Sequence, residues 1–93
     1  MLAVGAHVFI AHPDEVAEGT IVAEGTGDYH VTAAVRGADP WVVRVTRGTD
    51  AGCEGVFPAC VLCHSALAAS AVSAMLAAHD RYRERTGKKR EGG

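Results

Sequence analysis

The sequence predicts a mainly β domain followed by one long C-terminal helix. Short stretches of alternating apolar and polar residues, separated by turns that contain glycine and proline, fill the first two-thirds of the chain. An alanine-rich segment follows, in which apolar residues recur every three or four positions. The length of 93 residues fits a single small domain. We therefore expect a β domain over residues 1–64, a helix over 65–86 and a disordered basic tail over 87–93.

Five short strands are expected in the β domain. In chain order they lie at residues 7–12, 19–24, 29–35, 41–46 and within 54–62. Pro13 and Asp14 end the first strand, and a glycine-containing turn follows the second. The third and fourth strands alternate in the same way and are joined by a turn with a glycine, an aspartate and a proline. This pattern predicts that they pair with each other as a hairpin.

The last of these segments, Glu54–Leu62, reads EGVFPACVL. It resembles the closing segment of SH3-like small barrels, in which a short strand with a glycine and an aromatic residue meets a proline, one 3₁₀ turn and an apolar residue. The resemblance covers residues 5–63, has this segment as its one specific motif, and implies a five-stranded SH3-like barrel before the helix. The paired aromatics and acidic loop that hold proline-rich peptides in SH3 domains are not recognisable, so that activity is not expected.

The part of this segment that reads VFPACVL is also similar to the type II dihydrofolate reductases encoded on plasmids, which build one active pore by tetramerising. In that family a glutamine, an aliphatic residue and a tyrosine precede the proline. Here Gly55, Val56 and Phe57 occupy these positions, so the glutamine and the tyrosine hydroxyl are both missing. An oligomeric enzyme of this kind stays a minor alternative.

The predicted helix has boundary signals and very little polar surface. Ser65 suits an N-cap and Gly87 suits a stop. Between Ala66 and Ala78 the only polar residues are two serines, and a helix that is apolar nearly all round must be covered on more than one side. A small β domain covers one side, so we expect a homo-oligomer. The expected interface residues are Leu67, Ala71, Val72, Met75, Leu76 and His79.

Charge is divided unevenly along the chain, although the net charge is only −2. Residues 1–80 hold three basic and nine acidic residues, a net of −6, whereas residues 81–93 hold six basic and two acidic residues, a net of +4. A basic tail of this kind can bind nucleic acid or an acidic protein surface, including a second copy of the chain. The residues for the nucleic-acid alternative are Arg81, Arg83, Arg85, Lys88, Lys89 and Arg90.

Three cysteines lie near the end of the β domain, and Cys60–His64 reads CVLCH, the pattern of c-type haem attachment. Haem attachment requires export, but no targeting segment is visible, so we expect a cytoplasmic protein with reduced thiols and no membrane span. The set Cys53, Cys60, Cys63 and His64 has enough ligands for zinc, yet it contains a single CxxC. The preferred interpretation is a junction between barrel and helix, without a metal or cofactor.

The remaining candidates favour binding over catalysis. His12–Glu15 places an imidazole beside two carboxylates, but no nucleophile is fixed to it by spacing, so no catalytic residue is assigned. The expected binding residues are Tyr29, His30, Trp41 and Arg44. We therefore expect a non-catalytic binding or adaptor module that acts through a protein partner. Such a module also suits an accessory protein encoded by a phage or mobile element.

Overall fold

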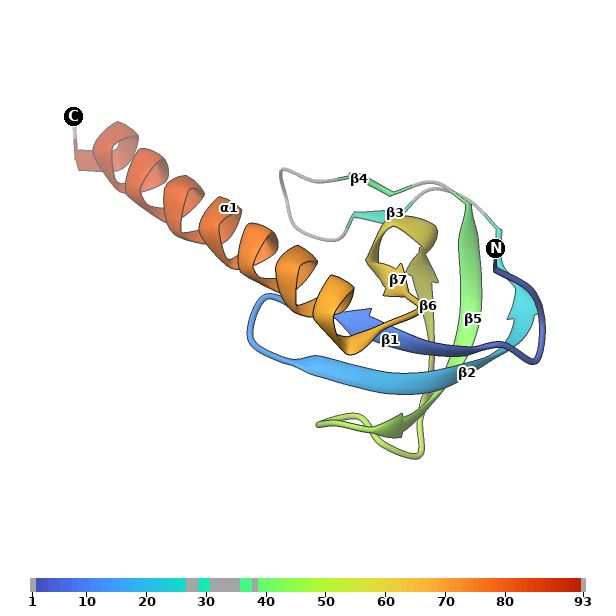
Figure 1. Cartoon of the computed structure of the whole chain (residues 1–93). Coiled ribbons are helices and arrows are strands. Elements are labelled where there is room, and N and C mark those ends of the chain that lie inside the picture. The colour runs from blue at the N-terminus through green and yellow to red at the C-terminus, as the bar shows by residue number, and fades with distance from the viewer. Residues whose placement is uncertain (1, 27–28, 31–35, 38, 93) are drawn as a thin grey trace.

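A computed structural model describes residues 2–26, 29–30, 36–37 and 39–92 (Figure 1). For residues 29–30, 36–37 and 82–92 it describes the backbone. The described elements are β1 (His7–Ala11), β2 (Val16–Glu24), β3 (Tyr29–His30), β4 (Arg36–Gly37), β5 (Pro40–Arg47), β6 (Glu54–Pro58), the 3₁₀ helix η1 (Ala59–Val61), β7 (Leu62–Cys63) and α1 (Ala66–Gly92).

Five of these strands form one antiparallel sheet in the order β6-β5-β2-β1-β7. The nine-residue β2 lies at its centre and pairs with β1 on one side and β5 on the other. The expected mainly β fold with one C-terminal helix is thereby confirmed.

The expected hairpin between residues 29–35 and 41–46 is wrong. Both edges of β5 are already occupied, by β2 and by β6, while β3 pairs with β4 in a separate two-stranded ladder. The buried side chains explain why β5 pairs with β2. Ala17 and Ile21 of β2 and Val43 and Val45 of β5 face the same side of the sheet, and all four are buried. Residues 31–35 of the expected strand lie outside the described residues.

Two irregularities bend the central pairing of β2 with β5. The register shifts between Glu18 and Gly19, where Thr46 is the extra residue, and again between Ile21 and Ala23, where Val22 is the extra residue. Shifts of this kind increase the local twist of a strand and turn side chains to new directions. The sheet curls accordingly: the His12 ring, just after β1, meets the Phe57 ring of β6 edge to face, with 5.7 Å between ring centroids.

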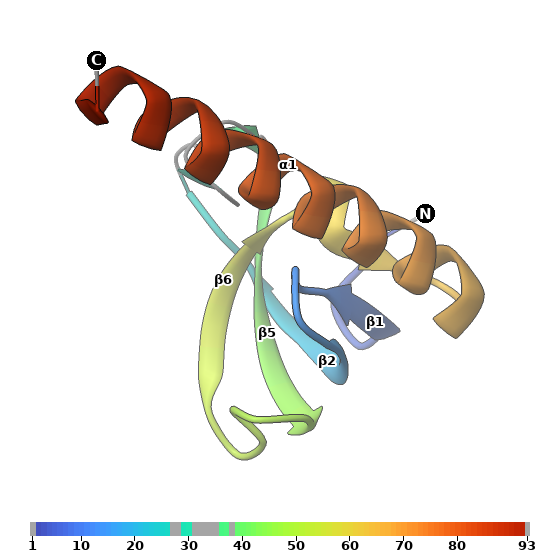
Figure 2. The same cartoon turned by 90° about the vertical axis from the view of Figure 1, so that its left-hand side faces the viewer.

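Helix α1 covers one end of the curled sheet (Figures 1 and 2). Its Ala69 and Leu76 are 0% and 1% exposed and belong to the core cluster. The Ser73 hydroxyl donates a hydrogen bond to the backbone oxygen of His12, which ties the helix to the end of β1. Ser65 caps the helix as expected, since its Oγ accepts from the Ala68 N–H at 3.1 Å.

The helix continues beyond its expected end at Gly87 and runs to Gly92. A single glycine inside a helix costs about 1 kcal/mol relative to alanine, and the lysines and arginine that follow favour helix. The C-terminal half of α1 projects away from the sheet (Figure 1). Nowhere in the described part of the chain does a helix reach the length and apolarity that crossing a membrane requires.

Candidate binding surfaces

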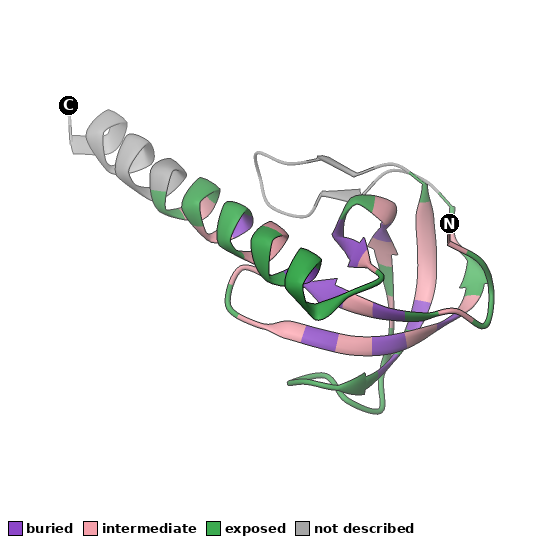
Figure 3. Ribbon diagram, in the orientation of Figure 1, coloured by how far each residue is buried: buried purple, intermediate pink, exposed green. Residues whose placement is uncertain are grey.

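The two sides of α1 differ sharply in exposure (Figure 3). The inner face packs on the sheet and consists of Ala69, Val72, Ser73, Leu76, Ala77 and Asp80, all buried or half-buried. The outer face is exposed and consists of Leu67, Ala71, Ala74, Met75 and Ala78. Leu67 is 83% exposed and Met75 is 52% exposed, high values for large apolar side chains. The outer face is therefore an apolar surface that the described part of the chain leaves exposed.

The six residues expected at an oligomer interface divide between these faces. Leu67, Ala71, Met75 and His79 are exposed, whereas Val72 is half-buried and Leu76 is buried. Val72 and Leu76 lie three and seven residues after Ala69, the spacing that keeps residues on one side of a helix. That side packs on the sheet: Leu76 belongs to the core and Val72 packs against it. Neither residue lies on the exposed face, so the expectation for these two is corrected.

A second surface is an open depression beside Trp41, with a volume of about 340 Å³. It is lined by Leu2, Glu24, Gly25, Asp39, Pro40, Trp41 and Ala59. Two backbone hydrogen bonds hold its rim together, from the Gly25 N–H to the Pro40 oxygen at 2.9 Å and from the Ala59 N–H to the Asp39 oxygen at 3.1 Å. A Cβ on Gly25 would lie 3.1 Å from Pro40, so this close approach favours glycine.

The expected binding residues do not all meet at this depression. Trp41 lines it and also packs against the core, while Arg44, three positions on, projects from the opposite face of β5. There the Arg44 guanidinium donates two hydrogen bonds to Glu54, the shorter at 2.7 Å. Tyr29 and His30 lie on β3, and their side chains fall outside the described structure.

Sequence reasoning missed the acidic residues of this depression, Glu24 and Asp39. Asp39 has φ of 52°, in the left-handed region that aspartate enters more readily than most residues. The sequence predicts a turn at Asp39 and Pro40, and this turn is the signal that marks the rim of the depression. Asp39 in this turn and Trp41 just after it line the same depression, and Glu24 reaches it from the end of β2.

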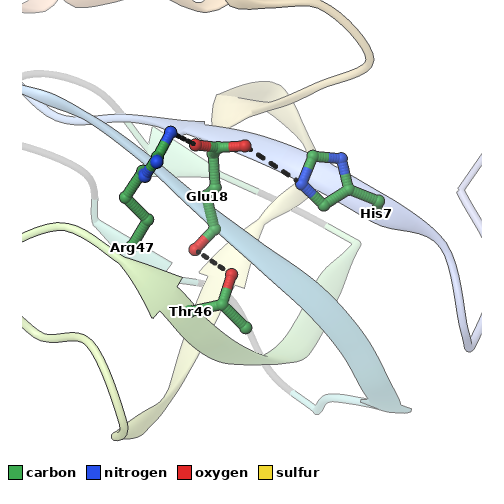
Figure 4. Close-up of polar contacts among 4 residues, drawn as sticks. All are labelled: His7, Glu18, Thr46 and Arg47. Carbon is green, nitrogen blue, oxygen red and sulfur yellow. Dashed lines mark hydrogen bonds and ion pairs between the residues drawn. The ribbon is translucent and has the colours of Figure 1, made fainter.

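A polar cluster on the outer side of the sheet joins three strands (Figure 4). The Glu18 carboxylate meets His7 Nε2 at 3.3 Å and Arg47 Nη1 at 3.2 Å, and its backbone oxygen accepts from Thr46 Oγ1 at 3.3 Å. The register shift at Thr46 brings Arg47 to the same face as Glu18. The side chains of His7 and Arg47 are 55% and 81% exposed, so these are solvent-exposed ion pairs that link β1, β2 and β5.

In the acidic turn after β1, two of the side chains contact other parts of the chain. The His12 ring packs against Phe57, and the Glu15 carboxylate accepts from the Thr49 N–H at 3.3 Å in a different loop. The backbone closes the turn through a hydrogen bond from His12 N–H to the Glu15 oxygen at 2.9 Å. The imidazole and the carboxylate are thus committed to separate neighbours.

The cysteines and His64 do not form the alternative zinc site. Cys53 lies in the loop before β6, Cys60 in η1 and Cys63 in β7. Across the part of the chain that the structure describes, no three histidine, cysteine, aspartate or glutamate side chains gather as metal ligands. Desolvation raises the pKa of both the Cys60 and the Cys63 thiols, and the charge of Cys60 raises the pKa of Cys63 further. Both thiols are therefore harder to ionise than a free cysteine, and the thiolate is the form that binds a metal.

Comparison of the chain with known protein families, with characterised proteins and with solved structures found no match.

Proposed function

We propose that this protein is a non-catalytic binding module that self-associates through the outer face of α1. The observation that carries the proposal is the exposure of Leu67 and Met75, at 83% and 52%, on a helix whose other face packs on the sheet. Contiguous apolar surface of this kind marks interaction sites on proteins.

The composition of the outer face suits a second helix. Leu67, Ala71, Ala74 and Ala78 follow one another at spacings of four, three and four residues, which places them in one line along the helix. Alanine lets helix axes approach closely, while burial of one leucine side chain stabilises the complex by about 1.5–3 kcal/mol. A copy of the same surface offers complementary partners, as closed symmetric dimers do.

The body of the module is, in this proposal, an SH3-like barrel. The strand order β6-β5-β2-β1-β7 supports this fold, and so does the turn η1 between β6 and β7. The contact between His12 and Phe57 also supports it, because it draws β1 and β6 together across the sheet. Such a body leaves the depression beside Trp41 open as the contact surface for another protein.

The test is the mass of the chain in solution, measured by analytical ultracentrifugation at micromolar concentration. We expect a dimer or larger assembly, and we expect Leu67→Glu with Met75→Glu to weaken self-association at least tenfold, since each glutamate replaces buried apolar area with a charge. The matched control is Val4→Glu, because Val4 is 59% exposed but lies far along the chain from α1. A monomeric mass for the unmodified chain, or equal weakening by the control, would contradict the proposal.

A further inference from the structure

We infer that the depression beside Trp41 binds an arginine side chain of a partner protein, with Glu24 and Asp39 holding its guanidinium beside the indole ring. The inference rests on the proposed role of this depression as a contact surface and adds the chemistry of the group that it takes. It does not depend on self-association, because none of the described residues that line the depression belongs to α1.

A β-bulge brings the first carboxylate beside the tryptophan. Regular pairing of β2 with β5 from Ile21 onward would place Ala23 opposite Trp41. The extra residue Val22 shifts the alternation by one, so that Glu24 takes this place instead. Residues directly opposite each other in an antiparallel pair share one face, with Cβ atoms about 4.5–5.5 Å apart. The bulge therefore sets a carboxylate, in place of a methyl group, next to the indole.

The second carboxylate, that of Asp39, is held near the first by the backbone. A hydrogen bond of 2.9 Å runs from the Gly25 N–H to the Pro40 oxygen, and these are the residues that follow the two carboxylates in the sequence. The backbone oxygen of Asp39 also accepts from the Ala59 N–H of η1 at 3.1 Å. Both acidic residues thus line one depression from backbone positions that hydrogen bonds fix.

The two carboxylates lack the arginine partners that other acidic residues of the sheet have. Glu18 and Glu54 each pair with an arginine of β5, at 3.2 and 2.7 Å. Within the part of the chain that the structure describes, Glu24 and Asp39 form no ion pair, and no described residue that lines the depression is basic. Two uncompensated negative charges beside an aromatic side chain complement a cation.

A guanidinium suits this surface better than an ammonium. It is planar and weakly hydrated, so it stacks on aromatic rings while its N–H groups point outward to carboxylates. The ammonium of lysine is compact and strongly hydrated, and the depression also has apolar walls, from Leu2, Pro40 and Ala59. Its volume of about 340 Å³ lies at the small end of the range of about 300–1,000 Å³ for ligand sites, which suits a single side chain.

Trp41 provides a direct readout of binding, because it is the single tryptophan of the chain and its indole N–H gives one signal in a nitrogen–proton correlation spectrum. The probe is a capped pentapeptide with one arginine among glycines. Its twins carry lysine, or citrulline, which resembles arginine without the charge. At low and constant ionic strength we expect the arginine peptide to shift the signal saturably, with a dissociation constant on the order of 1–10 mM. The citrulline peptide should bind about threefold more weakly or less tightly still, and the lysine peptide more weakly than the arginine peptide.

A pair of conservative substitutions tests the two carboxylates. Glu24→Gln with Asp39→Asn removes both charges and keeps both shapes, and asparagine tolerates the φ of 52° at position 39. We expect about threefold or greater weakening for the arginine peptide and little change for the citrulline peptide. The matched control is Asp14→Asn with Asp50→Asn, which changes the net charge equally. Asp14 precedes β2 and Asp50 follows β5, so both exposed residues lie at the far end of this strand pair, and arginine binding should stay unchanged.

The outcomes separate this inference from the proposed function. Equal binding of the arginine and citrulline peptides, or equal effects of the two double variants, would overturn the inference and leave the depression as a contact surface for neutral groups. Binding of the lysine peptide as tight as that of the arginine peptide would overturn the assignment to arginine. No saturable shift with any of these peptides would overturn both the inference and the role of the depression as a contact surface. A monomeric mass in solution would overturn self-association alone.

Discussion

The inner and outer faces of α1 are both mainly apolar but have opposite surroundings. Leu76 is 1% exposed and Leu67 is 83% exposed, although both are leucines on one continuous helix. Their positions relative to the sheet, nine residues apart in the sequence, account for the difference. The sequence of a helix that is apolar nearly all round therefore does not indicate which face packs on the sheet, and the fold decides it.

A hydrogen bond, in addition to apolar packing, holds the inner face of α1 on the sheet. Ser73, a polar residue in an apolar stretch, donates its hydroxyl to the His12 oxygen at the end of β1. The core side chains Ala69 and Leu76 lie four residues before it and three residues after it, on the same side of the helix. Polar and apolar contacts thus fix the same rotation of the helix about its axis.

The largest expected effect comes from truncation on the inner face. Leu76→Ala removes a buried side chain from the core cluster and leaves a cavity, so we expect the free energy of unfolding to fall by about 2–5 kcal/mol. Urea denaturation followed by circular dichroism measures this change. A loss of that size in a small domain leaves little stability.

The matched control is Leu67→Ala on the outer face, measured at a concentration at which the protein is monomeric. Leu67 is exposed, so we expect a stability change within about 0.5 kcal/mol. Equal losses for Leu67→Ala and Leu76→Ala in the monomer would contradict the assignment of the two faces.

The next largest effect on stability is expected at the N-terminal cap of α1. Ser65→Ala removes the Oγ that accepts from the Ala68 N–H, so we expect a loss of about 0.5–2 kcal/mol in thermal or urea unfolding. Ser70→Ala is the control, because Ser70 is exposed inside the helix and alanine favours helix more strongly. The control should stabilise by a few tenths of a kcal/mol; destabilisation by both would argue against the cap.

The sequence predicts the local elements well and their partners less well. Ser65 and the alanine-rich run correctly placed the start of α1, and the glycine and proline turns separated most of the strands. The hairpin of residues 29–35 with 41–46 failed because alternation reports which side chains share a face, and it carries no information on which strand lies beside another. That choice depends on long-range packing of Val43 and Val45 with β2.

The candidate sites show the same limit. Of the residues expected at an oligomer interface, Leu67 and Met75 are exposed and Leu76 is buried, because the sequence does not indicate how the helix is rotated about its axis. Trp41 and Arg44 were grouped from nearness in sequence, and strand alternation sends them to opposite faces.

The smallest expected effect lies at the junction just before α1, where Cys60 and Cys63 sit. Burial raises the pKa of both thiols above the usual value of 9.0, so the neutral thiol dominates in the folded protein until the pH exceeds that value. The reactive species is the thiolate, and we expect alkylation by iodoacetamide at neutral pH to be slower than for an unstructured cysteine peptide. Its rate should rise about tenfold per pH unit without levelling off below pH 9.

Mass spectrometry of each modified cysteine, with the urea-unfolded chain as control, measures these rates. Because the raised pKa is a property of the fold, unfolding should speed the reaction of Cys60 and Cys63 at the same pH. The sign is fixed by linkage: a thiol that is harder to ionise in the folded state makes the fold less stable as the pH rises through the usual thiol range. Fast alkylation of both residues in the folded chain at neutral pH would instead show ionised thiols, and it would reopen metal binding at CVLCH.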